Sequence, residues 1–384
     1  MPTCNPSPWP ALRATYHVAA ENQLDLDARV ESLLLEQTVE LPRTALRDKF
    51  ILDNIVGRLV SVKTLAIAGE KHAVMIDFPI SATGNDPAQF LNVLFGNSSI
   101  QDHVQLVDFH LPTTGEWPQR DKVLPGPQFG TAGIRNVTNV HGRALTSTAL
   151  KPIGLSTERL ALLCGLFAGA GIDIIKEDHG LADQSFHPFA ERVRACQKAV
   201  QEANRKSGRQ SIYVPNLIGT PTTVLAQLKF AQDEGCCAVM MAPMLLGLPL
   251  LADIVANHAL VPVIAHPSFG GATRIAPELL YGKLFPLYGA DATIYANFGG
   301  RFSYSKETCR KLADRLTTPD EPGLLPTLPM PAGGIKYQNV ADILAFYGTE
   351  VVLLIGGSLY EAGDDTALYA RALEFVRHVA EFKQ

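Results

Sequence analysis

Hydrophobic and polar positions follow two different patterns along the chain, and the change falls near residue 125. Before it, short runs in which apolar and polar residues alternate are separated by stretches with apolar residues every three or four positions. The alternation predicts strands with one buried face, and the longer spacing predicts amphipathic helices. Residues 1–125 are therefore expected to form a small α+β domain of ferredoxin-like type. The predicted strands are 14–20, 73–79 and 104–112, and the predicted helices are 26–37 and 86–96.

After residue 125, a short apolar run is followed by a turn and an amphipathic stretch, and this unit repeats eight times. Near-continuous apolar strands alternating with helices indicate a parallel sheet, and eight such units match a closed (β/α)8 TIM barrel over 126–384. A dinucleotide-binding fold is disfavoured, because no GxGxxG segment follows the first strand. The Pro- and Gly-rich stretch 122–136 is expected to be a connector. The predicted strands are 144–152, 171–178, 211–216, 236–242, 260–266, 292–297, 327–334 and 351–357, and the predicted helices include 156–171, 189–208, 220–235, 307–316, 339–348 and 364–382.

Composition and charge narrow the class of protein. The 384 residues are 47% hydrophobic and 18% charged, as in an ordinary globular protein. The net charge of −5, without a block of like charges, argues against binding to nucleic acid or to anionic lipid. The N-terminus does not resemble a signal peptide, and the longest apolar stretch is interrupted by prolines, glycines and an aspartate, so no membrane span is expected. The six cysteines contain no CxxC pair and are expected to be free thiols, so we expect a soluble cytoplasmic protein.

Most polar residues of the predicted barrel strands lie at the carboxyl end of each strand, where barrel enzymes place their chemistry. Structural stability alone gives no reason for such a bias. The polar residues concerned are Lys151, Lys176, Asp178, His179, Asn216, His266 and Asn297. At the ends of the last two strands stand the glycines Gly333, Gly334, Gly356 and Gly357.

The second predicted strand is the most informative of these. With a period of two, Lys176 and Asp178 share the inward face and Glu177 points to the helices. The lysine and the aspartate form either a buried ion pair or a site for a hard cation. The second arrangement requires an uncharged lysine, which burial favours by lowering its pKa. The neutral amine can react with CO2 to form a carbamate, whose oxygens suit Mg2+.

Two Gly-Gly pairs follow the last two predicted strands. Gly333 and Gly334 stand in AGGI, and Gly356 and Gly357 stand in IGGS. Their backbone N–H groups are able to cradle a phosphate at adjacent strand ends, where barrels commonly build such a site. With Arg301 as a counter-charge, these pairs predict a phosphate site, although glycine also closes ordinary turns.

Several of these motifs, in this order, resemble those of the ribulose-bisphosphate carboxylase large-subunit superfamily. They are LKPIGLS (150–156), GIDIIKEDHG (171–180), GGRFSYS (299–305), PAGGI (331–335) and LLIGG (353–357), preceded by EQTVELPR (36–43) and LFGNSS (94–99). The resemblance covers nearly the whole chain. It implies an α+β domain followed by a (β/α)8 barrel, and a homodimer in which each active site combines residues of both subunits. Glu36 and Asn97 match the first-domain residues that reach the neighbouring subunit's metal and substrate.

The resemblance also implies roles for the strand-end residues. Lys176 matches the lysine that the family carbamylates, and Asp178 matches its metal-binding aspartate. His179 stands where the family has a glutamate ligand, so whether it binds the metal stays open. Lys151 matches the lysine close to the reacting carbon, and His266 matches the strand-five histidine.

Other positions depart from the carboxylase pattern. Arg301 stands where the carboxylase has a flexible-loop lysine that steadies CO2, and Pro267 replaces the arginine that grips a second phosphate. Ala332 replaces a serine in the strand-seven loop. These departures match the form IV group, the RuBisCO-like proteins, which act on methylthio-pentulose phosphates or on 3-oxo sugar-acid phosphates.

We therefore predict Mg2+-dependent enolisation of a phosphorylated ketose or a 3-oxo sugar-acid phosphate, leading to isomerisation or to C–C cleavage with decarboxylation, rather than CO2 fixation. Either the carbamate on Lys176 or Lys151 would remove the α-proton. The alternative is a non-catalytic dimeric binding or regulatory protein on the same fold, which the histidine at position 179 supports.

Overall fold

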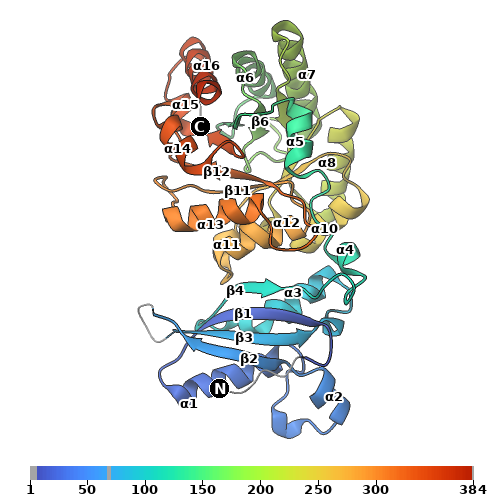
Figure 1. Ribbon diagram of the computed structural model, residues 1–384. Helices are drawn as coiled ribbons and strands as arrows, with labels where there is room; N and C mark the ends of the chain where they lie inside the picture. The colour runs from blue at the N-terminus through green and yellow to red at the C-terminus, as the bar shows by residue number, and fades with distance from the viewer. Residues whose placement is uncertain (1–6, 67–70, 383–384) are drawn as a thin grey trace. The chain divides into compact units, whose positions relative to one another are not determined.

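The computed structural model describes residues 7–66 and 71–382, and it divides into two compact units (Figure 1). The first unit runs to Leu124 and also includes Gly270–Leu280 and Glu321–Gly323. The second unit contains the other residues from Pro125 onward. Each unit has its own sheet, four-stranded and antiparallel in the first and parallel in the second.

The first unit is built on a sheet with the order β2-β3-β1-β4. Every second residue of its central strand β1 is buried, and the Tyr16 hydroxyl donates to the Leu94 carbonyl of α3 at 2.6 Å. The edge strand β2 was not predicted, because its positions are mostly exposed and show no clear alternation. The main elements are β1 (Ala11–Ala19), α1 (Gln23–Glu36), α2 (Lys49–Asn54), β2 (Arg58–Thr64), β3 (Lys71–Pro79), α3 (Pro87–Phe95), β4 (Val104–His110) and α4 (Arg120–Val123).

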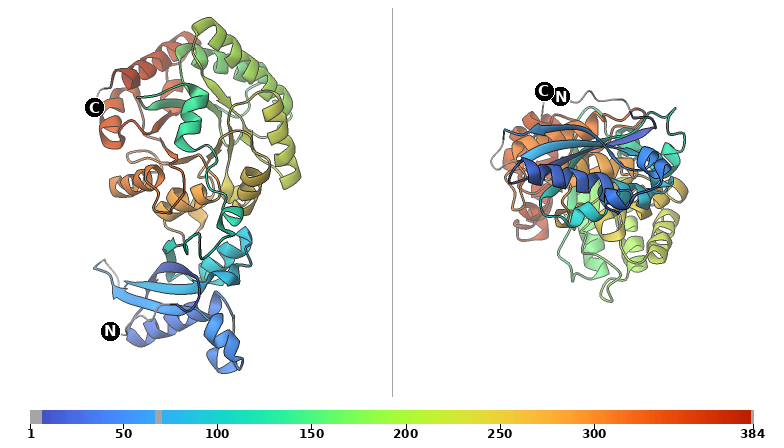
Figure 2. Two further views of the ribbon diagram at one scale, coloured as in Figure 1. Left: turned by 45° about the vertical axis from the view of Figure 1, so that its right-hand side comes forward. Right: turned by 90° about the horizontal axis from the view of Figure 1, so that it is seen from below.

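The second unit is a (β/α)8 barrel, as the sequence predicts, with its helices outside the strands (Figure 2). The strands are β5 (Leu145–Leu150), β6 (Ile174–Glu177), β7 (Ile212–Val214), β8 (Asn216–Leu217), β9 (Val239–Met241), β10 (Val263–Ala265), β11 (Ala292–Ala296), β12 (Leu328–Ala332) and β13 (Val352–Ile355). The helices are α5 (Gly130–Thr138), α6 (Thr157–Ala170), α7 (Phe189–Ser207), α8 (Pro221–Asp233), α9 (Pro243–Leu246), α10 (Leu248–Asn257), α12 (Phe285–Leu287), α13 (Lys306–Thr317), α14 (Val340–Tyr347), α15 (Gly357–Tyr360) and α16 (Asp365–Glu381).

Pro215 divides the third barrel strand into β7 and β8, and the continuity of these two segments in the chain closes the barrel. The sheet order is β7-β6-β5-β13-β12-β11-β10-β9-β8, so the two ends of the list, β7 and β8, are consecutive in the chain. Proline has no N–H to donate to a neighbouring strand. Its carbonyl still accepts from the Met240 amide at 2.9 Å. The eight predicted strands therefore correspond to nine observed segments.

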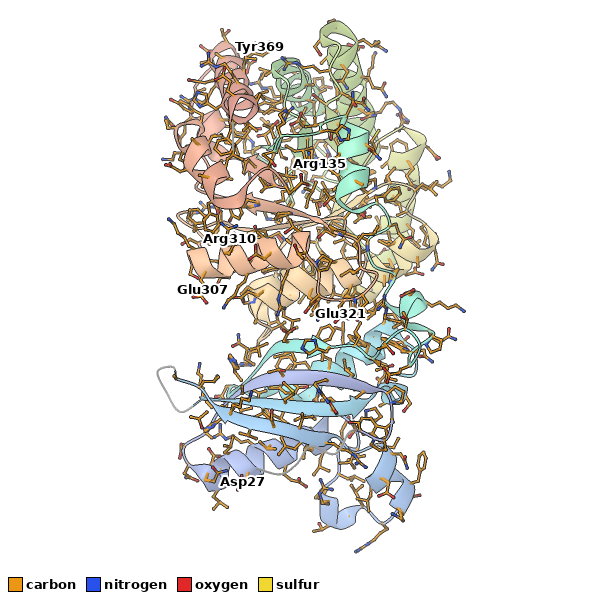
Figure 3. All side chains as sticks on the ribbon, viewed as in Figure 1. Asp27, Arg135, Glu307, Arg310, Glu321 and Tyr369 are labelled. Carbon is orange, nitrogen blue, oxygen red and sulfur yellow. The ribbon has the colours of Figure 1, made fainter. Side chains whose placement is uncertain are left out.

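The barrel interior is filled by apolar side chains from alternate strand positions, among them Ile174, Ile212 and Met240, which is the packing that the period of two predicts. Ile134 of α5 joins this core. The stretch 122–136 is therefore not a simple connector, because it contains the start of a helix that bonds to the chain just before β5, β11 and β13, at the amino-terminal end of the barrel. Arg135 of α5, labelled in Figure 3, pairs with Glu350 just before β13 at 2.9 Å. Two glycines within α5 weaken its helix signal in the sequence.

Cys164, Cys196, Cys236 and Cys309 are buried free thiols and Cys237 is a partly buried one, as predicted, while Cys4 lies outside the described residues. Among the described residues, no helix is long and apolar enough to cross a membrane.

Candidate active site at the carboxyl ends of the barrel strands

The structure places the predicted strand-end residues at the ends of parallel strands. Lys151 directly follows β5, Lys176 lies within β6, and Asp178 and His179 directly follow β6. The register of β5 against β6 pairs Leu150 with Glu177, so the next residues of the two strands, Lys151 and Asp178, are neighbours. The sequence pattern therefore brings these groups to one end of the barrel.

Asp178 lies at the centre of a connected group of side chains. Its Oδ2 atom is 2.7 Å from Lys151 Nζ, and its Oδ1 atom is 3.4 Å from His179 Nδ1. Burial raises the pKa of the Asp178 carboxyl, but hydrogen bonds from His179 and Lys151 and the charges of Lys176 and Lys151 outweigh it and hold the pKa well below its ordinary value. Asp178 is therefore a carboxylate at physiological pH.

The Lys151 backbone is also fixed. Its N–H donates to the Tyr360 hydroxyl at 3.1 Å, and that hydroxyl donates to the Ala149 carbonyl at 2.8 Å. Tyr360 lies on α15, just after the second Gly-Gly pair. Sequence reasoning missed Tyr360, because a tyrosine in a short helix carries no signal for such a contact.

Lys176 has a different environment from Lys151. Only 1% of its surface is exposed, and its Nζ atom donates to the Glu177 carbonyl at 2.9 Å. Burial lowers the pKa of Lys176 from 10.5 to about 8, while Asp178 opposes this change and Lys151 adds to it. A large fraction of the lysine is therefore a neutral amine near pH 8. The ion pair with Asp178 is made by Lys151.

His266 directly follows β10 and contacts the same group. Its ring stacks on His179 with centroids 4.3 Å apart and planes inclined by 20°. Burial, followed by the charges of Lys176 and His179, holds the pKa of His266 well below its ordinary value. Its Nδ1 atom accepts from the Ser268 amide at 3.2 Å, so the proton of the neutral ring is on Nε2.

The first Gly-Gly pair adopts a backbone that favours glycine. Gly333 and Gly334 have φ angles of +92° and +71°. A Cβ on Gly334 would lie 2.8 Å from the Gly299 carbonyl oxygen, and a Cβ on Gly300 would lie 2.9 Å from the Gly333 carbonyl carbon. The loops after β11 and β12 are therefore in backbone contact, and glycine is required on both sides.

The other predicted phosphate ligands lie in loops at the same end of the barrel. Gly356 and Gly357 follow β13, and Gly357 begins α15. Arg301 is exposed, and its guanidinium carbon lies 4.8 Å from the centroid of the Phe302 ring. Its role as a phosphate counter-charge stays a prediction.

Glu36 and Asn97 belong to the first unit. Glu36 is the last residue of α1, and Asn97 begins a short 3-10 helix, Asn97–Ile100. The buried side chain of Gln37 links the two segments, because it donates to the Val93 carbonyl at 3.0 Å and accepts from the Ser98 amide at 3.3 Å. Their predicted contribution to a neighbouring subunit stays a prediction.

Whether Mg2+ can bind beside Asp178 depends on the ligand atoms that the neighbouring side chains supply. Among the described residues, no set of three or more His, Cys, Asp and Glu side chains is arranged to hold a metal ion. Asp178 supplies carboxylate oxygens, whereas His179 and His266 supply nitrogen, which Mg2+ disfavours. A carbamate on Lys176 would add the missing oxygen donors. The residues therefore fit Mg2+ once Lys176 is carbamylated.

Comparison with known proteins gives a consistent set of relatives. The catalytic-domain model of the ribulose bisphosphate carboxylase large chain matches residues 130–261. The ribulose bisphosphate carboxylase-like protein 1 of Rhodopseudomonas palustris is 45% identical over 371 residues, which cover 96% of this chain and 98% of that protein. The 5-methylthioribulose-1-phosphate isomerase of Rhodospirillum rubrum is 41% identical over 374 residues, which cover 96% of each chain. The crystal structure of a Rubisco-like protein from Rhodopseudomonas palustris matches with a TM-score of 0.88 and 43% identity, covering 98% of this chain and 99% of that chain.

Proposed function

Because the chain belongs to the ribulose bisphosphate carboxylase large-chain family and is similar over nearly its whole length to RuBisCO-like proteins, we propose that it enolises a phosphorylated ketose without fixing CO2. The observation that carries this proposal is the buried Lys176, with a pKa lowered to about 8, next to the ion pair of Lys151 and Asp178. A base beside a fixed positive charge is the arrangement that proton abstraction α to a carbonyl requires.

Each residue then has a definite task. Lys176, in its neutral or carbamylated form, removes the α-proton. Lys151, held by Asp178 at 2.7 Å, places a positive charge where the enediolate oxygen becomes negative. His266, neutral and with its proton on Nε2, donates a hydrogen bond to a second substrate oxygen. Lys151 is the alternative base, and proton abstraction by a Lys176 variant that keeps Lys151 would favour it.

A Mg2+ ion fits the proposal when Lys176 is carbamylated. Asp178 and the carbamate would hold it, and His179 is positioned to join them directly or through water. Such an ion supplies Lewis-acid polarisation of the substrate carbonyl. The unmodified lysine, in contrast, would repel a cation, so CO2 and Mg2+ should bind cooperatively.

The proposed substrate carries one phosphate. The Gly333–Gly334 and Gly356–Gly357 backbones would bind it, with Arg301 as counter-charge. Pro267 provides no charge for a second phosphate. A methylthio-pentulose 1-phosphate is our first candidate, because the Rhodospirillum rubrum relative is named a 5-methylthioribulose-1-phosphate isomerase. A 3-oxo sugar-acid phosphate, cleaved through the same enolate, is the second.

We also propose that the protein works as a homodimer with shared active sites. Support comes from Glu36 and Asn97, which match the residues that the family uses across its subunit interface and which Gln37 holds together. The opposing candidate is a non-catalytic binding protein. It is favoured by His179 at a position where the family has a carboxylate.

Product analysis by NMR tests the function. The protein is preincubated with bicarbonate and Mg2+ and then given 5-methylthioribulose 1-phosphate or a 3-oxo sugar-acid phosphate. We expect turnover by the wild type, none by Lys176→Ala, and full turnover by Lys229→Ala, which removes an exposed lysine of α8. Binding of both compounds in calorimetry without product from either would instead support the non-catalytic candidate.

A further inference from the structure

A buried carboxylate lies directly behind the candidate catalytic residues. Glu177 stands between Lys176 and Asp178 on the outer face of β6, and it is fully buried. It accepts hydrogen bonds from Arg192 of α7 through both carboxylate oxygens, from the Tyr213 hydroxyl at 2.5 Å and from the Asn216 amide at 2.9 Å. These hydrogen bonds come from three elements, α7, β7 and β8.

Two of these partners also hold the loop that carries Asp178 and His179, the 178–188 loop between β6 and α7. Arg192 donates through Nη1 to the carbonyls of Ala182 at 2.7 Å and His187 at 2.6 Å. Asn216 donates through Nδ2 to the carbonyls of His179 at 3.1 Å and Leu181 at 2.9 Å. Four carbonyls of this loop thus accept from the side chains of Arg192 and Asn216. Both residues also bond to Glu177, Arg192 through its guanidinium and Asn216 through its backbone N–H.

Stability alone does not account for this network. The side chains of Glu177 and Arg192 are both 0% exposed, and a buried ion pair seldom stabilises a fold more than apolar packing of similar volume. Arg192 also donates to His187 Nδ1, which leaves the proton of that neutral ring on Nε2. This Nε2 atom is buried and has no hydrogen-bond partner in the part of the chain that the structure describes. Such costs are acceptable where a reactive group must be held within a fraction of an ångström.

We propose that Arg192 and Asn216 are positioning residues for the candidate active site. They act through the 178–188 loop: with its carbonyls held, the Asp178 carboxylate faces Lys151 and the His179 ring stacks on His266. This inference rests on the proposed function, because it assigns these two residues to the same proton-transfer site. They do not contact the substrate and are not catalytic residues.

Asn216→Ala is the decisive variant, since it removes both donors to the loop and leaves the backbone N–H that bonds to Glu177. Arg192→Lys is a second variant, but it puts a shorter cation into a buried site and can prevent folding. The matched control is Asn204→Ala near the end of α7. Asn204 makes the same kind of contact with Ser211, donating to its carbonyl at 2.8 Å and accepting from its amide at 3.0 Å. Ser211 directly precedes β7, so this contact lies at the end of the barrel opposite to the candidate active site.

Two readouts are compared in the full-length protein. Hydrogen exchange by mass spectrometry should be faster at residues 178–188 in Asn216→Ala and unchanged there in Asn204→Ala. A displacement on the order of an ångström at a catalytic group costs roughly 100-fold in rate. We therefore expect kcat to fall about 10- to 100-fold in Asn216→Ala, with KM changed less than about twofold. Asn204→Ala should keep the wild-type kcat.

The inference is overturned if exchange in the 178–188 loop is unchanged in Asn216→Ala, or if the control has the same effect on exchange and kcat. If the wild type itself has no activity with the candidate substrates, the proposed function fails. The exchange comparison then still decides whether Asn216 holds the loop, so the two failures are distinguishable.

Discussion

The buried Lys176 makes the stability of the protein depend on pH in a calculable way. Its pKa is about 8 in the folded state, against 10.5 for an ordinary lysine. Between these values the unfolded chain binds more protons than the folded one, so this residue makes stability rise with pH. The cost of burying the ammonium is about 3 kcal/mol at pH 7, where both states are protonated, and it falls by about 2 kcal/mol by pH 9.5.

Lys176→Met isolates this effect, because it retains much of the volume and removes the charge. Urea unfolding of both proteins would be followed by circular dichroism from pH 7 to 9.5, in CO2-depleted buffer with EDTA. Contributions from all other groups largely cancel in the difference. We expect the stability of the variant relative to wild type to fall by about 2 kcal/mol over this range.

The matched control is Lys229→Met, at a lysine whose side chain is 75% exposed. Its stability relative to wild type should be nearly constant with pH. A constant difference for Lys176→Met as well would refute the reasoning, because Lys176 would then be charged in the folded protein throughout. The neutral amine required for carbamylation would be lacking.

Three further predictions concern the shared site and the phosphate. If the first unit serves the neighbouring subunit, mixed dimers of Glu36→Gln and Lys176→Ala should regain activity that neither homodimer has, and demonstrated heterodimers without activity would count against sharing. With Pro267 in place of arginine, a pentulose monophosphate should bind more tightly than its bisphosphate in calorimetry, and the reverse order would contradict the single phosphate site. Gly334→Ala should raise KM for a phosphorylated substrate about tenfold or more. The control Gly142→Ala should leave KM unchanged, because Gly142 has a similar φ of +73° but open space where its Cβ would lie. Equal effects of the two substitutions on KM would show that backbone strain alone is responsible.

The sequence predicts the barrel well because its strands are apolar over several consecutive residues and its helices begin and end with recognisable caps. Ser156, Thr220 and Ser305 each accept a hydrogen bond from the first turn of the following helix, as expected of N-cap residues. The edge strand β2 and the glycine-containing helix α5 lack such signals and were missed. The edge strand β2 pairs with the next strand, β3, whereas α5 is held by residues distant in the chain, such as Asp291 and Glu350.

The sequence predicts which residues belong to the candidate site better than it predicts which of them contact each other. Alternation along β6 places Lys176 and Asp178 on one face, but the Lys151–Asp178 pair depends on the register between β5 and β6. Likewise, Asn216 is visible as a polar residue at a strand end, whereas its bonds to the 178–188 loop depend on the path of that loop. Such contacts arise from tertiary structure, and no local pattern records them.

Solvent deuterium exchange tests the central claim most directly, because it detects proton abstraction whatever the final product. A methylthio-pentulose 1-phosphate is incubated with the protein in D2O, with bicarbonate and Mg2+ present, and its α-carbon is followed by proton NMR. We predict deuterium incorporation by the wild type and by Lys229→Ala, and none by Lys176→Ala. Incorporation at the wild-type rate by Lys176→Ala would contradict the account, because the buried lysine would then not be the base.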